Sequence, residues 1–317
     1  MIAELLNTLW VSSIYSLMSV PLTLSYRVTK IINFAHISFI TYGAYVAVIF
    51  SLLLPLGLIE TSLIVFLVVA VLAVLNHMLV LSPLMSRGTN VVTLMIASMG
   101  SWIFLKYLLY ALVSSAQKVL RVDLFYVTPN IAIPSTIIIG EFRVSTFLLI
   151  SNAMNIMTLL FLYVFLMKVK LGRAMRAVAD NAGLAQITGI SKNAVLNATW
   201  ILTGGIAALG GLAWSLSYYA SPELGDNVIL QVFACSVIGG LSSIPLTFAG
   251  AFVIAFAENI LIAWLHTYLG LDVSFRPFIS FLTLLLVILI RPPAGGGGGL
   301  PYRFKLPFRG DKKRSTS

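Results

Sequence analysis

The stretch TSLIVFLVVAVLAVLNHMLVLS, residues 61–82, decides the fold class of this protein. It contains no Lys, Arg, Asp or Glu, and it is long enough to cross a bilayer as a helix, which takes roughly 20 mainly apolar residues. Lipid offers no hydrogen-bond partner to a free backbone N–H or C=O, and a helix pairs these groups internally. The stretch therefore predicts a transmembrane helix.

Similar apolar runs recur along most of the chain, at 5–26, 36–56, 89–113, 145–167, 194–216, 245–265 and 274–291. A further run, 228–241, is too short for an ordinary span and suits a half-helix or a re-entrant segment. These runs predict an all-α, polytopic membrane protein with eight or nine transmembrane helices, of which one or two are broken or re-entrant.

Composition supports the same class. The chain has 317 residues, 59% hydrophobic and 9% charged, whereas soluble domains carry about 25% charged residues. The net charge of +10 resides in loops and a tail, where it orients the protein in a membrane and does not indicate nucleic acid as a partner. We expect one transmembrane domain, 1–291, and a flexible basic tail, 292–317, that contains a glycine run near its start.

Basic loops predict the orientation. The connection 168–193 carries Lys168, Lys170, Arg173, Arg176 and Lys192 against one acid, Asp180. Basic loops stay on the cytoplasmic side, so this connection is expected inside and, counting back, the N-terminus outside. The basic tail is also expected inside, which requires nine crossings with 228–241 among them; eight crossings is the alternative.

The same connection predicts a short helix. Ala174–Ile187 is rich in alanine; Val178, Ala182 and Ala185 share one face, and Arg176 and Asp180 form an i,i+4 pair on another. Gly189 suits the end of this helix, and Ser191 suits the cap of the next. Such a helix either docks into a soluble partner that drives the membrane helices, or is an interfacial linker.

Two segments are candidates for broken helices, one in each half of the chain. In 27–45, RVTKIINFAHISFITYGAY, Asn33 and His36 stand where a loop enters the membrane, and Gly43 permits close helix packing. The alternative is that Asn33 caps the second helix and His36 lies in the headgroup zone. Paired breaks of this kind point to the central site of a transporter.

The second candidate is 237–250, VIGGLSSIPLTFAG, in which small and polar residues interrupt apolar sequence: Gly239, Gly240, Ser242, Ser243 and Pro245. Unwound backbone here must be buried in protein or line a cavity. Further on, Glu258 lies inside the apolar run AFAENILIAW. It either faces the pathway or pairs with Lys106 or Arg276, both of which we place near helix ends.

Several kinds of chemistry have no motif in this chain. There is no GxxxxGK[ST] phosphate loop, no HExxH zinc motif and no recognisable Ser/His/Asp set. We therefore expect no catalytic residues, no metal site and no cofactor bound by this chain. Energy for transport has to come from a partner or from an ion gradient.

At these segments the sequence resembles the smaller of the two permease types of branched-chain amino acid importers of the ATP-binding cassette class. The resemblance runs along about 290 residues, and its motifs are Ile32–His36, Tyr42–Tyr45, Gly172–Ala177, Ala179–Asn181, Ala185, Gly189–Ile190, Ile238–Leu241, Ser243–Pro245 and Glu258. It departs from the family at Ile37, Ser38, Ser242 and Leu246, which touch the expected pathway.

The resemblance implies a multi-pass subunit of the cell (inner) membrane. It implies a heterodimer with a second permease, two cytoplasmic ATPase subunits that use ATP, and an extracytoplasmic substrate-binding protein. The ATPases would dock on a coupling loop, whose residues are Gly172, Arg173, Arg176, Ala179, Asp180, Asn181, Ala185 and Gly189. The candidates for the translocation pathway are Asn33, His36, Gly43, Gly239, Gly240, Ser243, Pro245 and Glu258.

Two other functions stay open from sequence. A self-sufficient secondary transporter or channel also lacks ATPase motifs, but it has no need of a docking helix. An intramembrane enzyme would need a catalytic set. The solute itself is expected to be a branched-chain amino acid, another amino acid, an amide or urea.

Overall fold

The structure is a computed structural model that describes residues 2–290 apart from 135, 140–141 and 271. The predicted tail, 292–317, lies outside the described residues. Within the described part, seven helical rods are long and apolar enough to span a membrane. They are α1 (Ile2–Thr29), α2 (His36–Leu53), α3–η1–α4 (Leu58–Asn76, His77–Leu81, Ser82–Ser86), α5 (Val91–Leu120), α6 (Thr146–Lys168), α9 (Lys192–Ser217) and α11–η2–α12 (Ile244–Phe256, Ala257–Leu261, Ile262–Leu269).

Two shorter apolar helices complete the bundle, α10 (Leu224–Ile238) and α13 (Arg276–Ile290), the latter after a 3₁₀ turn, η3 (Val273–Phe275). Every predicted apolar run, including the short 228–241, therefore corresponds to a helix, and the all-α polytopic class is confirmed. α5 continues to Leu120, beyond the predicted end at 113. The hairpin of β1 (Thr136–Ile139) and β2 (Phe142–Ser145) pairs antiparallel in the following connection.

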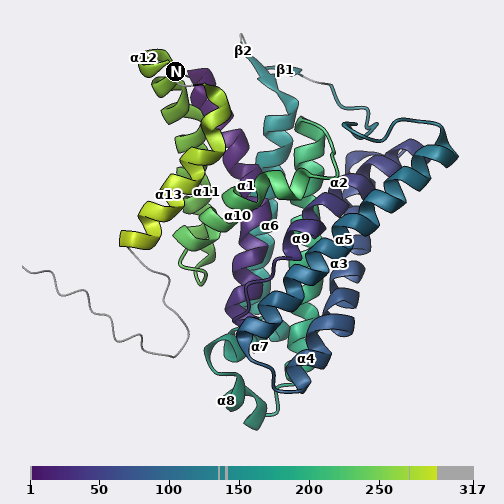
Figure 1. Cartoon of the computed structure of the whole chain (residues 1–317), viewed down its shortest axis with the longest axis vertical. Coiled ribbons are helices and arrows are strands. Elements are labelled where there is room, and N and C mark those ends of the chain that lie inside the picture. Colours follow the sequence, from purple (N-terminus) through teal and green to yellow (C-terminus); the bar gives the residue numbers. More distant parts are fainter. Residues whose placement is uncertain (1, 135, 140–141, 271, 291–317) are drawn as a thin grey trace, which may run out of the picture.

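Helices α1, α2 and α9 form the centre of the bundle. Most of each is buried within the chain, whereas α3, α5 and α6 leave most of their apolar surface exposed, as lipid-facing helices do. Figure 1 shows α11–α13 on one side of this centre and α3 and α5 on the other, with α7 (Lys170–Asp180) and α8 (Ala182–Ile187) at the end opposite the N-terminus.

The first predicted break is present and lies deep in the protein. α1 ends at Thr29 and α2 begins only at His36. The His36 imidazole Nε2 lies 2.7 Å from the backbone carbonyl oxygen of Met18, near the middle of α1. The Ser98 hydroxyl accepts from the backbone N–H of Phe34 at 3.2 Å and lies 3.4 Å from the carbonyl oxygen of Ile32, to which it can donate. The unwound backbone is thus buried in protein, as lipid requires.

Both polar residues of this break have partners within the protein. His36 is buried against the centre of α1 and does not lie in a headgroup zone. Asn33 Oδ1 accepts from the backbone N–H of Ala35 at 3.2 Å, so this side chain caps the turn that leads into α2 at His36.

The second predicted break separates α10 from α11. Gly240 and Leu241 both adopt positive φ, 65° and 55°, which reverses the chain sharply. The hydroxyl of Ser243 accepts from Leu246 N at 3.4 Å and caps α11, and Pro245 occupies its first turn. Thr247 and Thr23 hydroxyls lie 2.8 Å apart, so this turn sits near the end of α1 that carries Thr29.

The predicted coupling helix is two helices. α7 ends at Asp180 and α8 begins at Ala182, because Asn181 is extended (φ −152°, ψ 101°) and its side chain accepts from Leu184 N at 3.0 Å. Asparagine favours such a cap over a helix interior. Ser191 caps α9 as predicted, through Ala194 N, and Gly189 has a positive φ of 87°. The Arg176–Asp180 pair is not formed among the described residues.

Glycines allow α2 and α9 to pack with their backbones in contact. A Cβ added to Gly43 would lie 2.3 Å from the carbonyl oxygen of Ala208, and one added to Gly211 would lie 1.9 Å from that of Ile40. Neither backbone can retreat without separating the two helices. Gly43, predicted as a pathway residue, is therefore a packing residue in this structure.

We predict that Gly43→Ala lowers the stability of the folded chain by about 1–3 kcal/mol, the usual cost of overpacking. The matched control is Gly100→Ala in α5, where an added Cβ has no atom within 4 Å and a helical alanine is favoured. Thermal unfolding of both variants in detergent measures the difference. Equal stability of the two variants would contradict the close α2–α9 contact.

Candidate functional site

Glu258 forms the centre of a buried polar cluster between α1, α10, α13 and η2. Its carboxyl group accepts from Tyr15 Oη at 2.6 Å, from Gln231 Nε2 at 2.9 Å, and from the Ser280 hydroxyl. η2 is a π-helical turn, a feature often found at functional sites, and it presents Glu258 and the neighbouring Asn259 together. Each of these donors comes from a different helix, so the cluster ties the bundle together.

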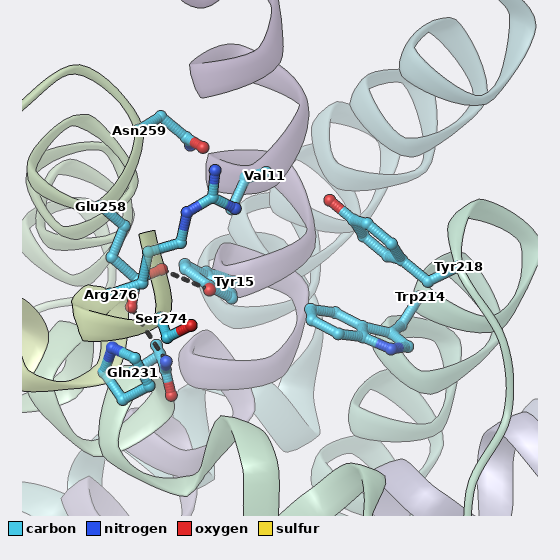
Figure 2. A pocket seen from close by; sticks show the side chains of 10 residues that line it. Val11, Tyr15, Trp214, Tyr218, Gln231, Glu258, Asn259, Ser274 and Arg276 are labelled. Carbon is cyan, nitrogen blue, oxygen red and sulfur yellow. Dashed lines mark hydrogen bonds between the residues drawn. The ribbon is translucent and has the colours of Figure 1, made fainter. Parts of the chain in front are cut away.

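A cavity of about 290 Å³ opens beside this cluster. Figure 2 shows its two unlike walls: Glu258, Tyr15 and Arg276 on one side, and the rings of Trp214 and Tyr218 on the other. The remaining lining residues are Val11, Gln231, Asn259, Ser274 and Pro277. Tyr218 also stacks on Trp10, with ring centroids 5.7 Å apart. The cavity thus offers an acidic group, a basic group and an aromatic surface.

The predicted partners of Glu258 are corrected by the structure. Arg276 lines the same cavity without an ion pair to Glu258 among the described residues. Lys106 pairs instead with Asp226, with Nζ and Oδ2 2.5 Å apart. Lys106 lies at the middle of α5 and not near a helix end, so it cannot extend its ammonium group to the membrane surface.

Of the predicted pathway residues, Glu258 alone lines this cavity. His36 and Gly43 hold α2 against α1 and α9, and Gly239, Gly240, Ser243 and Pro245 build the α10–α11 turn. The sequence reasoning missed Tyr15, Trp214, Tyr218 and Gln231. Of these, Gln231 carried a usable sign, because it is an uncharged polar residue inside a short apolar run.

The coupling segment has a buried face and an exposed face. Met175, Val178 and Ala179 of α7 are buried against the bundle, and Ala185 of α8 is buried as well. Gly172 makes the corner between α6 and α7 possible, since a Cβ there would lie 2.1 Å from the carbonyl oxygen of Phe165. The exposed face carries the predicted Arg173, Asp180 and Asn181.

Two large apolar residues also project from this exposed face, and sequence reasoning missed them. Leu184 is 60% exposed and Ile187 is 84% exposed. They lie one turn apart on α8, opposite the buried Ala185. Leu184 and Ile187 are spaced i,i+3 and flank Ala185, and this spacing could have predicted that they share an exposed face. Neighbouring apolar side chains this exposed suit a surface that contacts either a partner protein or the membrane.

These features define a multi-pass membrane protein with a polar cavity inside its helix bundle. The chain belongs to the family described as "Branched-chain amino acid transport system / permease component", whose profile matches residues 4–290. The family predicted from the sequence is therefore confirmed, and so is a transport role in place of an enzymatic one.

Several curated relatives agree. A probable branched-chain amino acid transport permease protein LivH of Methanocaldococcus jannaschii is 30% identical over 260 residues, 82% of this chain and 80% of that protein. The high-affinity branched-chain amino acid transport system permease proteins BraD of Pseudomonas aeruginosa and LivH of Escherichia coli are 26% and 25% identical and cover 80% and 89% of this chain, and 84% and 92% of their own lengths.

Among solved structures, a chain titled "PsaBC from Streptococcus pneumoniae in complex with Fab" aligns over 92% of both chains. The identity is 12% and the TM-score 0.49, which is too low to establish a common fold.

We predict that Tyr15→Phe destabilises the bundle by about 1–3 kcal/mol, because it removes a donor from the buried carboxyl group of Glu258. Tyr268→Phe is the matched control, since Tyr268 is 69% exposed. Thermal unfolding in detergent distinguishes the two. A Tyr15→Phe variant as stable as the control would show that the Tyr15–Glu258 bond contributes little.

Proposed function

We propose that this chain is the membrane-spanning permease subunit of an ATP-binding cassette importer for branched-chain amino acids or similar small polar solutes. The observation that carries the proposal, beside the family, is the α7–α8 pair. It is fixed to the bundle through one face and presents Leu184 and Ile187 on the other. A partner ATPase that binds this face can move the helices to which it is fixed.

The distribution of basic residues supports an orientation with α7 and α8 in the cytoplasm and the N-terminus outside. Lys30 and Lys192 line one small cavity together with Val178 and Asp180, so the basic connections after α1 and before α9 lie at the same end of the bundle. Basic residues gather on the cytoplasmic side of membrane proteins. The family supports the cell (inner) membrane as the proposed location.

Force from an ATPase has a direct route into the membrane helices. The corner at Gly172 joins α7 to α6 with backbones in contact, and Met175 and Ala179 pack into the core that contains α1. A rigid corner of this kind transmits a displacement of α7 instead of absorbing it. ATP binding and hydrolysis would then shift the populations of inward- and outward-facing states through differential contacts with α7 and α8.

The proposed partners are two cytoplasmic ATPase subunits, a second permease that forms a heterodimer with this chain, and an extracytoplasmic substrate-binding protein. ATP is used by the partner subunits, and we propose no cofactor for this chain. The cavity beside Glu258 supports a small solute, since Glu258, Arg276 and the Trp214 ring offer contacts for groups of both charges and for an apolar side chain.

The competing function is a secondary transporter or channel that needs no ATPase. In such a protein no ATPase would cover the exposed apolar pair on α8, and exposing apolar side chains to water is unfavourable. The two functions therefore differ in what α8 contacts.

We predict that Ile187→Glu weakens the complex with the ATPase, because a charge replaces an 84% exposed apolar side chain at the proposed interface. The conservative control is Ile187→Leu. Co-purification of the ATPase with each variant, together with ATP-driven uptake in proteoliposomes, measures the effect. Retained co-purification and uptake with Ile187→Glu would contradict docking on α8.

We also predict that uptake of labelled leucine by the complete transporter requires ATP on the α8 side of the membrane. A panel with a second amino acid, an amide and urea defines the solute. Uptake by the purified chain without any ATPase would support the secondary transporter or channel instead.

A further inference from the structure

A row of polar side chains joins α5 to the start of α10, and we call it the polar seam: Trp102, Lys106, Tyr110, Glu223 and Asp226. Asp226 accepts from Trp102 Nε1 at 3.1 Å and pairs with Lys106 at 2.5 Å. Tyr110 donates to Glu223. The three α5 residues follow at i, i+4 and i+8, so they form one stripe along that helix.

The polar seam lies near the middle of α5, well away from both helix ends. Lys106 is near the midpoint of α5, which runs from Val91 to Leu120. At 1.5 Å per residue it is about 20 Å from either end, more than a lysine side chain can reach. The start of α10 is fixed at the same depth, because Gly225 N donates to Thr41 Oγ1 on α2 at 3.0 Å.

The side chains of the polar seam are partly exposed at the surface of the chain. The side chains of Lys106 and Asp226 are each 25% exposed, and Asn227, Ile103 and Tyr107 beside them are exposed. Charged groups at this depth face a bundle interior or a water-filled cavity and avoid lipid. Within α5, the neighbouring flank is apolar and exposed at Phe104, Leu108 and Leu112, as expected of a lipid-facing surface.

We propose that the polar seam lines a water-filled part of the solute pathway, and that the flank through Phe104 faces lipid. The assignment rests on the proposed transport function. Water is favoured over a tightly packed partner because Glu223 and Asp226 carry more negative charge than Lys106 neutralises, and a dry interface would leave that excess charge buried. The excess also suits a solute with an ammonium group.

Accessibility at matched positions of α5 tests the proposal. Ile103 and Phe104 are adjacent and lie at the same depth, one beside the polar seam and one on the apolar flank. Nitroxide spin labels are attached to Ile103→Cys, Phe104→Cys and Tyr107→Cys in a Cys235→Ala background, in the complete transporter in nanodiscs. Electron paramagnetic resonance then compares relaxation by a water-soluble nickel chelate with relaxation by oxygen, which concentrates in lipid.

We expect the nickel chelate to dominate at positions 103 and 107 and oxygen to dominate at 104. Oxygen dominance at 103 and 107 would overturn the proposal, because the face would then meet lipid. Low accessibility to both reagents at 103 and 107 would overturn it as well, because a partner would then cover the seam. The measurement involves neither ATP nor uptake, so its failure leaves the α8 docking test unaffected.

A functional readout uses the double variant Lys106→Gln/Asp226→Asn, which removes the ion pair without changing the net charge of the chain. We expect it to assemble with the ATPase normally and to lose most of its solute uptake. Normal uptake by the assembled double variant would overturn a role of the seam in the pathway. Loss of assembly would overturn it too, since the pair would then be a structural tie.

Discussion

Inside a bilayer every polar group must find its partner within the protein, and this constraint shapes the whole chain. It accounts for the burial of the unwound segment between Thr29 and His36, whose polar groups bond to Met18 and Ser98. It also accounts for Glu258, whose carboxyl group receives donors from three different helices. Polar residues thus act here as specific connections between helices, because apolar contact alone distinguishes poorly between one helix face and another in lipid.

Close packing supplies the other part of the stability. Without water to drive helices together, association depends on how nearly their backbones approach. Gly43 and Gly211 allow α2 and α9 to meet, and Gly172 allows the sharp corner that holds α7 under α6. The same device therefore serves two purposes. It fixes the centre of the bundle, and it makes the link to α7 rigid enough to transmit motion.

The helices were predictable because their lengths and hydropathy follow from the thickness of a bilayer, and the two breaks were predictable because Gly, Pro and Asn interrupt apolar runs. The polar clusters around Glu258 and Lys106 were less predictable from the sequence. A single sequence shows that Glu258 and Lys106 are unusual, because both are charged residues inside apolar runs. It does not show that Tyr15 and Gln231 donate to Glu258, or that Asp226 pairs with Lys106. Those pairings depend on helix neighbours distant in sequence. The split at Asn181 was hidden by the alanines around it, which favour a continuous helix.

The short helix α10 connects the two polar regions of the membrane domain. Asp226 in its first turn belongs to the polar seam, and Gln231, five residues later, donates to Glu258 beside the cavity. Residues five apart on a helix point about 140° away from one another, so α10 stands between the two regions with one face toward each. It begins after a turn at Glu223 and ends at the reversal formed by Gly240 and Leu241, so neither end continues into a long helix. A rotation of α10 would therefore change both polar regions at once. A helix that continued into its neighbours could rotate in this way only if the neighbouring helices moved with it.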